Sequence, residues 1–215
     1  MARILITSGP TRQHLDPVRY LTNASSGRMG RALSEAALEL GHEVVIITGP
    51  VQVTYPDAVT LVEVVSTDEM LAAAKAEFAN CDGAIGAAAP CDYRPVFVST
   101  EKIAKTGEPL VLHLVETEDV IATLGQQKQE RWVVGFALET DDRRLRALAK
   151  LERKHCDLMV SNGPEAMHAL DNDVEILSPA GEVLQRLRGA KEEVARGILA
   201  IIEERLIRPR RRRDQ

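Results

Sequence analysis

The hydrophobic positions at the start of the chain follow two different spacings. Residues 4–6 form a short continuous apolar run, which is typical of a parallel strand covered on both faces and predicts a strand over residues 3–7 in mid-sheet. Apolar residues then recur at helical spacing, which predicts a helix over residues 27–40 with Ser25 or Ser26 as the N-cap. A second apolar run over residues 44–47 completes a strand–helix–strand unit, whose crossover is nearly always right-handed.

The same two spacings continue to the end of the chain. Apolar runs predict strands over residues 59–65, 84–89, 110–114, 132–138 and 158–161, and a hairpin formed by residues 174–177 and 183–187. Helical spacing predicts further helices, capped by Ser66 or Thr67 and by Thr117, and over residues 143–155 and 191–205. This alternation predicts an α/β fold: a Rossmann-like, doubly wound, mostly parallel sheet with an antiparallel hairpin addition near the C-terminus.

We expect one domain over residues 1–207, followed by a basic, disordered tail over residues 208–215 that carries five arginines. The whole chain has 27 Lys and Arg against 32 Asp and Glu, a net charge of -5, which argues against nucleic acid as the main partner. The apolar runs are all much shorter than the roughly twenty residues of a membrane span. The sequence therefore predicts a cytoplasmic protein that binds neither nucleic acid nor a membrane.

The cysteines and histidines do not show the spacing of a metal site. Cys81, Cys91 and Cys156 are too few and too scattered for a disulfide framework or a Cys-x-x-Cys motif. The five histidines also lack ligand spacing. We therefore predict no metal site built from protein side chains.

The segment between the first predicted strand and helix, residues 8–26, is long and rich in functional groups. It combines glycine and threonine with Arg12, Arg19 and Asn23, and it leads into a helix start whose N–H groups and dipole attract anions. Arginine can bind a phosphate or carboxylate through two parallel hydrogen bonds. Loops of this length are either functional or disordered, and we interpret this one as a binding loop. The dinucleotide fingerprint G-x-G-x-x-G is absent.

A second functional segment spans residues 88–107. The small residues of the preceding strand leave room for a flat ligand, although they are equally consistent with tight packing against a helix. The residues that follow lack periodicity and predict a mobile flap. Lys102 and Lys105 on such a flap could close over a polyphosphate, although solvated lysines would give the same pattern.

These segments closely resemble the signatures of the phosphopantothenate-cysteine ligase (phosphopantothenoylcysteine synthetase) family. The first signature is matched by Gly9-Pro-Thr-Arg12 and by Asp16-Pro-Val-Arg19-Tyr-Leu-Thr-Asn23-Ala-Ser-Ser-Gly27-Arg-Met-Gly30. The second is matched by the alanine pair, Asp92-Tyr93-Arg94 and the lysine flap, with two departures: Pro90-Cys91 replaces a small residue and alanine, and Ala104 replaces a flap lysine. Residues 117–120, 134–140 and 150–157 resemble three further family blocks.

The resemblance implies specific roles for individual residues. The catalytic residues would be Asn23, which hydrogen-bonds an acyl-nucleotide intermediate, and Lys102, which is needed for the nucleotide-dependent step. Phosphopantothenate would be bound by Arg19, Asn23, Ala88 and Ala89, with Arg19 reaching across a dimer interface. The nucleotide would be bound by Gly9, Thr11, Ser26, Gly27, Ala88, Ala89, Asp92, Lys102, Thr117, Glu118, Asp119, Val120, Phe136, Lys150 and Lys154.

The resemblance also implies an activity in coenzyme A biosynthesis. The chain would join 4′-phosphopantothenate to L-cysteine through an acyl-nucleotide intermediate, preferably an acyl-cytidylate, with release of pyrophosphate. It would use Mg²⁺ with CTP rather than ATP, no flavin, and a homodimeric assembly. Because no decarboxylase domain precedes Met1, we expect a free-standing synthetase whose product is used by a separate decarboxylase.

Two alternatives from other classes remain open at this stage. An NAD(P)-dependent short-chain oxidoreductase has a similar fold, but the glycine fingerprint and a Tyr-x-x-x-Lys pair are missing. A catalytically silent nucleotide-binding protein is also consistent with the Pro90-Cys91 and Ala104 departures. Release of pyrophosphate from CTP or ATP in the presence of both acceptor substrates separates these possibilities.

Overall fold

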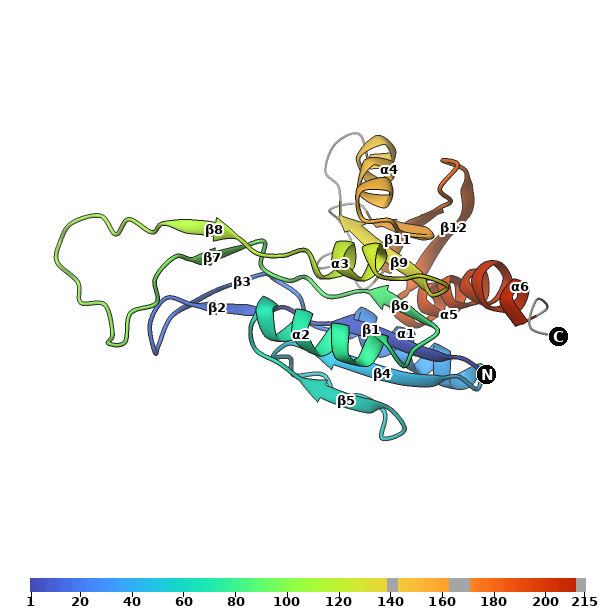
Figure 1. Cartoon of the computed structure of the whole chain (residues 1–215), viewed down its shortest axis with the longest axis horizontal. Helices are drawn as coiled ribbons and strands as arrows, with labels where there is room; N and C mark the ends of the chain where they lie inside the picture. The colour runs from blue at the N-terminus through green and yellow to red at the C-terminus, as the bar shows by residue number, and fades with distance from the viewer. Residues whose placement is uncertain (139–142, 163–170, 212–215) are drawn as a thin grey trace.

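A computed structural model of the protein describes residues 1–138, 143–162 and 171–211, and its central element is an eight-stranded sheet (Figure 1). In spatial order the strands are β12 (Val183–Ala190), β11 (Asp171–Leu177), β10 (Leu158–Asn162), β9 (Trp132–Leu138), β6 (Gly83–Gly86), β1 (Arg3–Ser8), β4 (Glu43–Thr48) and β5 (Thr60–Glu63). Strands β10 through β5 pair in parallel, whereas β11 and β12 add an antiparallel hairpin at one edge. The predicted fold class and the central position of the first strand are therefore confirmed.

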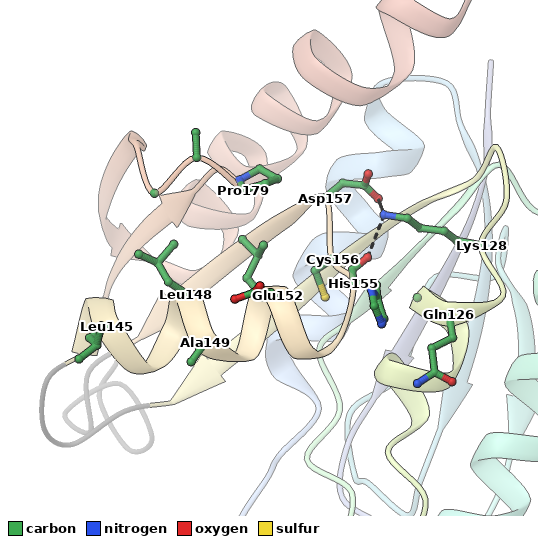
Figure 2. Close-up of a pocket in the computed structure, with 14 residues that line it drawn as sticks. Gln126, Lys128, Leu145, Leu148, Ala149, Glu152, His155, Cys156, Asp157 and Pro179 are labelled. Carbon is green, nitrogen blue, oxygen red and sulfur yellow. Dashed lines mark hydrogen bonds and ion pairs between the residues drawn. The ribbon is translucent and has the colours of Figure 1, made fainter.

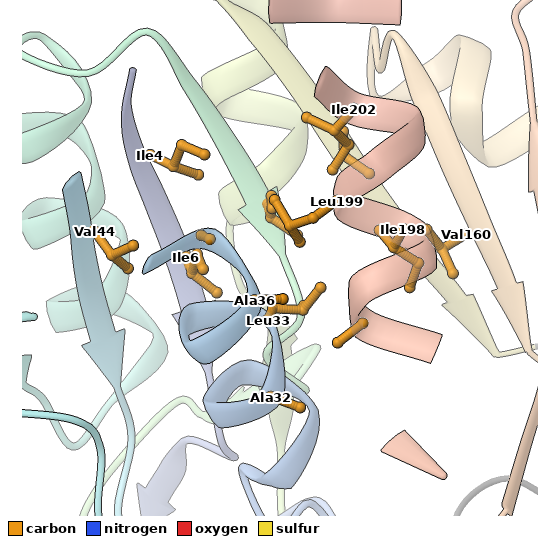
Figure 3. Packing of buried hydrophobic residues seen from close by; sticks show 14 of the residues in the cluster. Ile4, Ile6, Ala32, Leu33, Ala36, Val44, Val160, Ile198, Leu199 and Ile202 are labelled. Atoms are coloured by element: carbon orange, nitrogen blue, oxygen red, sulfur yellow. The ribbon is translucent and has the colours of Figure 1, made fainter. Parts of the chain in front are cut away.

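Successive residues of a strand point to opposite sides, so the buried apolar strands of this sheet present apolar side chains on both faces. Helices cover both of these faces. On one face, Ile4 and Ile6 pack against α1 (Arg28–Glu39) and α5 (Lys191–Ile202), as Figure 3 shows. On the other, Leu5 packs with α2 (Thr67–Phe78), α3 (Val120–Gln126) and α4 (Arg143–Arg153). Each fully buried aliphatic side chain contributes about 1.5–3 kcal/mol from its removal from water. The two apolar layers therefore hold the carboxyl ends of the parallel strands in fixed positions.

Helices α1 and α5 lie side by side and run in the same direction. The Arg196 guanidinium, about halfway along α5, forms an ion pair with Glu39, the last residue of α1, at 2.9 Å. At their N-terminal ends the charge of Arg28 acts on Lys191, the first residue of α5. The first and last long helices of the chain therefore begin at the same place.

The C-terminal helix extends further than the sequence predicted. A π-helical turn over Glu203–Ile207 continues α5, and α6 (Arg208–Arg211) follows directly. Ile207 is buried in the core and anchors this extension. The predicted disordered tail over 208–215 is thus wrong for its first four residues, while 212–215 lie outside the described residues.

Two helix starts also differ from the predictions. Gly27, with a left-handed φ of 76°, is the N-cap of α1, and neither Ser25 nor Ser26 caps it. Glycine suits that position because a Cβ there would also lie only 2.9 Å from Val51 Cγ1. The N-cap of α3 is Asp119 rather than Thr117, because the Thr117 hydroxyl donates to the Cys91 carbonyl at 2.7 Å instead.

Two short antiparallel pairs extend away from the main sheet (Figure 1). They are β2 (Arg12–His14) with β3 (Tyr20–Thr22), and β7 (Tyr93–Pro95) with β8 (Leu114–Glu116). We call residues 12–22 and 93–116 the arm. The predicted strand over 110–114 is wrong except for Leu114, because these apolar residues are exposed on the arm; Val111, for example, is 73% exposed.

Candidate functional site

The segments that follow β1 and β6 meet the end of β9 at the carboxyl edge of the sheet and form two adjoining pockets. The α3 pocket, about 550 Å³, lies beside the start of α3, and the α1 pocket, about 470 Å³, lies at the start of α1. The two pockets share a wall formed by Ala88, Pro90, Asp92, Phe136 and Lys150. A ligand can therefore span both pockets across this wall, at the edge where doubly wound sheets bind ligands.

The α3 pocket contains most of the residues that the resemblance assigned to the nucleotide. In addition to the shared wall, it is lined by Thr117, Glu118, Asp119, Val120 and Lys154. Asp119 accepts a hydrogen bond from the Ala122 N–H through Oδ1 and pairs with Lys154 Nζ through Oδ2 at 3.0 Å. This ion pair fixes the lysine at the rim of the pocket, between the start of α3 and the end of α4.

Asn23 lies at the α1 pocket and is held by the loop that follows β6. Its Nδ2 donates to the backbone carbonyls of Ala89 at 3.2 Å and Pro90 at 2.8 Å. Ser26 and Gly27 line the same pocket at the start of α1. Predicted binding residues from two segments distant in sequence are thus brought together here.

The helix start reaches the pocket because α1 packs unusually close to β1. A Cβ on Gly30 would lie only 2.0 Å from Ser8 Oγ, so any larger residue would push the helix away. The Ser8 hydroxyl also donates to the Gly27 carbonyl at 3.3 Å. Small side chains at this contact therefore set the position of the N-terminal N–H groups.

The small residues of β6 make room for α3 and for Trp132, and Gly86 also lines the α3 pocket. A Cβ on Gly86 would approach Ile121 Cδ1 to 2.4 Å, and one on Gly83 would approach the ring of Trp132 to 2.0 Å. Of the two readings of this strand, tight packing applies within β6, which ends at Gly86 rather than at residue 89. Ala88 and Ala89, which follow it, line the α1 pocket.

Gly9 and Thr11 do not line either pocket but form hydrogen bonds to the loop that follows β6. The Thr11 hydroxyl is buried, accepts from the Cys91 N–H at 2.8 Å and lies 2.8 Å from Thr67 Oγ1. The Gly9 carbonyl accepts from the Ala89 N–H. These contacts hold the 88–91 loop, and the buried Cys91, whose pKa is raised by burial, packs into the same contact.

Arg19 and Lys102 lie on the arm and are not among the residues lining the two pockets. Arg19 binds the buried Asp16 carboxylate at 2.6 Å and the Ile103 carbonyl, and the Ile103 N–H donates to Asp16 at 3.1 Å. Burial disfavours the Asp16 charge, but these hydrogen bonds and those from the Val18 and Arg19 N–H groups hold its pKa well below the usual value. Lys102 is exposed and directly precedes Ile103, whose backbone is held by Arg19 and Asp16.

Among the described residues, three cations and one acid line the α1 pocket: Arg28, Lys150, Lys191 and Asp92. Of these, Arg28 and Lys191 were not identified from the sequence. Burial, followed by the charge of Arg28, lowers the pKa of Lys191. The only available sequence signal was a lysine at the first position of a helix, where acidic residues are favoured.

Two asparagines at the same pocket were also missed. The buried Asn172 accepts from Lys191 Nζ through Oδ1 at 2.9 Å, while its Nδ2 has no hydrogen-bond partner within the described part of the chain. Asn162 Oδ1 is likewise buried and unpartnered among residues 1–138, 143–162 and 171–211. Leaving a buried polar group unpaired costs about 1–3 kcal/mol, so these atoms favour a polar ligand.

A larger depression of about 1000 Å³ lies elsewhere, between α4 and the turn at Pro179 (Figure 2). Its Lys128 is occupied by Asp157 at 2.9 Å and by the His155 carbonyl at 2.8 Å. Burial raises the pKa of Cys156 to about 12, so this thiol is not a nucleophile at neutral pH. Because Lys128 is paired with Asp157 and the Cys156 thiol stays protonated, this depression lacks the convergent chemistry of the paired pockets.

No group of three or more His, Cys, Asp or Glu residues suited to a metal is present among the described residues. Asp92 is the acidic residue that both pockets share. Among the helices that the structure describes, none is long and apolar enough to cross a membrane. Glu139 and Thr140 of the third family block lie outside the described residues.

The sheet, its two layers of helices and the pockets at its carboxyl edge define a ligand-binding α/β protein of the doubly wound class. The chain belongs to the DFP family, described as the DNA/pantothenate metabolism flavoprotein C-terminal domain, whose match spans residues 1–206.

Similarity to curated proteins and to solved structures supports this family membership. The bifunctional coenzyme A biosynthesis protein CoaBC of Vibrio vulnificus strain YJ016 is 39% identical over 186 residues, which are 83% of this chain and 46% of the relative. The crystal structure of the C-terminal domain of a CoaBC protein has a TM-score of 0.82 with 40% identity, and the match covers 94% of each chain. A Cab2 mutant in complex with phosphopantothenate-cysteine has a TM-score of 0.80 at 17% identity over 98% and 89% of the two chains, which shows a shared fold. The chain spans about half the length of these curated relatives.

Proposed function

We propose that this chain is a phosphopantothenate-cysteine ligase that acts in coenzyme A biosynthesis through an acyl-nucleotide intermediate. The observation that carries the proposal is the pair of joined pockets, with the predicted nucleotide residues around one and Asn23 at the other. Family membership and the CoaBC relatives support the same activity. CTP, rather than ATP, is the proposed nucleotide.

The first step activates the carboxylate of 4′-phosphopantothenate. One carboxylate oxygen attacks the α-phosphorus of CTP, the bond from that phosphorus to the bridging oxygen breaks, and pyrophosphate leaves with the electron pair. With the nucleoside in the α3 pocket, the phosphates cross the wall at Asp92 and Lys150. Lys150 at this wall offsets the charge that develops on the phosphate oxygens. The carboxylate would lie beside Asn23, whose amide both donates and accepts hydrogen bonds.

Asp92 suits a magnesium ion bound together with the phosphates. Mg²⁺ is usually held by one or two carboxylates, phosphate oxygens and water rather than by a full protein cage, which matches one shared acid at the wall. When bound, it would neutralise part of the triphosphate charge.

The second step forms the amide. The amine of L-cysteine attacks the acyl carbon, the bond from that carbon to the nucleotide oxygen breaks, CMP leaves, and the amine gives up a proton. The resulting 4′-phosphopantothenoylcysteine is a substrate for a decarboxylase, and we propose that both reactions take place in the cytoplasm.

We also propose that the protein is a homodimer assembled through the arm. Phe97 and Val111 on the arm are 77% and 73% exposed, and neighbouring apolar residues add to this surface. Large exposed apolar patches usually mark interaction sites. Arg19 and Lys102 line neither pocket of their own chain, so in the proposed dimer they would act at the pockets of the partner chain. Sedimentation of Phe97→Ser should show a smaller species than the unmodified chain; equal sizes would contradict assembly through this surface.

The activity is tested by pyrophosphate release from CTP and from ATP, with 4′-phosphopantothenate and L-cysteine added separately and together. The expected result is release that requires phosphopantothenate, faster with CTP, and an amide product by mass spectrometry that requires cysteine. CTP binding without pyrophosphate release would indicate a silent nucleotide-binding protein. An absorbance change with NADPH would indicate an oxidoreductase.

A further inference from the structure

The end of the α1 pocket at Lys191 is a cationic recess, and within the described part of the chain the pocket's one acidic side chain is Asp92 on the shared wall. Helices α1 and α5 run in parallel and both begin there, and neither has a side-chain hydrogen bond at its N-cap among the described residues. The positive ends of two helix dipoles therefore combine with the charges of Arg28 and Lys191. Glu192 and Glu193 follow in the first turn of α5 but do not line the pocket.

One buried hydrogen-bond donor in this recess has no partner within the described part of the chain. Lys191 Nζ uses one of its donors on Asn172 Oδ1 at 2.9 Å, and this bond fixes the ammonium beside the asparagine amide. Asn172 is 1% exposed, and its Nδ2 has no partner in the described part of the chain. An anionic oxygen bound here would accept hydrogen bonds both from this buried N–H and from the adjacent ammonium.

The order of the pockets indicates which anion fits. A nucleotide with its nucleoside in the α3 pocket must extend its phosphates over the shared wall into the α1 pocket. Asn23, the proposed neighbour of the reacting carboxylate, lies on a different segment of this pocket from Lys191, which comes from the opposite end of the chain. The pyrophosphate must leave on the side of the phosphorus opposite the carboxylate, because the displacement is in line.

We infer that Lys191, held by Asn172 and assisted by Arg28, binds the β- and γ-phosphates of the nucleotide and then the pyrophosphate product. This inference rests on the proposed function for the identity of the anion. In the reaction the bond between the α-phosphorus and the bridging oxygen breaks, and the Lys191 ammonium stabilises the charge that pyrophosphate takes with it.

The test compares binding of inorganic pyrophosphate, CTP, CMP and 4′-phosphopantothenate to the full chain by isothermal titration calorimetry. Lys191→Met should weaken binding of pyrophosphate and CTP at least tenfold and leave binding of CMP and phosphopantothenate within twofold. Lys191→Arg should retain most of the pyrophosphate affinity, because the charge remains. Lys75→Met, which changes an exposed lysine of α2, should alter none of them.

Several outcomes would overturn the inference. They are no pyrophosphate binding by the unmodified chain, unchanged pyrophosphate binding by Lys191→Met, or an equal loss of CMP binding. A loss confined to phosphopantothenate would show that the recess serves the other substrate. Thermal unfolding of each variant separates loss of the site from loss of the fold. Lys191-dependent pyrophosphate binding in a chain without ligase activity would support the recess while removing the ligase assignment.

Discussion

Replacement of Asn23 by aspartate tests the centre of the proposed mechanism. The change removes the Nδ2 donor that binds two carbonyl oxygens, at 3.2 and 2.8 Å, and places a carboxylate beside them. Each neutral hydrogen bond contributes about 0.5–1.5 kcal/mol net, and Asn23 is exposed, so we expect a loss of stability of about 1 kcal/mol. Loss of one donor to a reacting oxygen typically costs about 10²–10³ in rate, and we expect an effect of that size on ligation.

Rapid-quench experiments with labelled CTP measure the two steps of this variant separately. Asn23→Asp should form the acyl-nucleotide slowly or fail to retain it, while chemical denaturation shows a nearly unchanged fold. Asn80→Asp makes the same chemical change in an exposed residue after α2, away from the pockets, and should leave both steps intact. Cysteine ligation by Asn23→Asp within threefold of the unmodified rate would refute the role of Asn23.

Three further changes examine the flap lysine, the α1 contact and the arm. Lys102→Gln should abolish turnover, and unchanged pyrophosphate release would contradict its assignment to the nucleotide-dependent step. Gly30→Ala forces a Cβ to within 2.0 Å of Ser8 Oγ and should lower the free energy of unfolding by about 1–3 kcal/mol in urea denaturation; unchanged stability would mean that α1 can shift at no cost. The pKa of Asp16 is depressed from 3.8 by folding, so its stabilisation should be complete above that pH and fall as the pH decreases below it. Limited proteolysis of the arm should therefore accelerate below about pH 4, and Asp16→Asn should show fast cleavage already at neutral pH; equal cleavage rates would contradict this fastening role.

The sequence correctly predicted those elements that are determined by residues close to one another along the chain. The run Ile4-Leu5-Ile6 identified a central strand because both of its faces are buried. Ser66 or Thr67 was predicted as the cap of α2, and Ser66 is the one that caps it, in a capping box with Glu69 that lies within four residues. The exposed arm was misread as a strand over 110–114 because apolar residues that are exposed in the single chain have the same pattern as buried ones.

The recess at Lys191 could not be predicted in the same way. Asn172 and Lys191 are separated by an entire hairpin, and both meet Arg28 only because α1 and α5 pack in parallel against one face of the sheet. The α1 cap was missed because left-handed Gly27 replaces a side-chain cap, and two nearby serines offered a more usual one. These features depend on tertiary packing rather than on the spacing of neighbouring residues.

The parallel packing of α1 and α5 has a consequence for biosynthesis of the protein. Arg28 is synthesised well before Lys191, so a nascent chain lacks half of the recess until α5 has docked on the sheet. Residues of α5 such as Ile198 and Leu199 also complete the hydrophobic core. Completion of the core and acquisition of the cationic recess are therefore the same late event, and a prematurely terminated chain that ends before α5 would have neither.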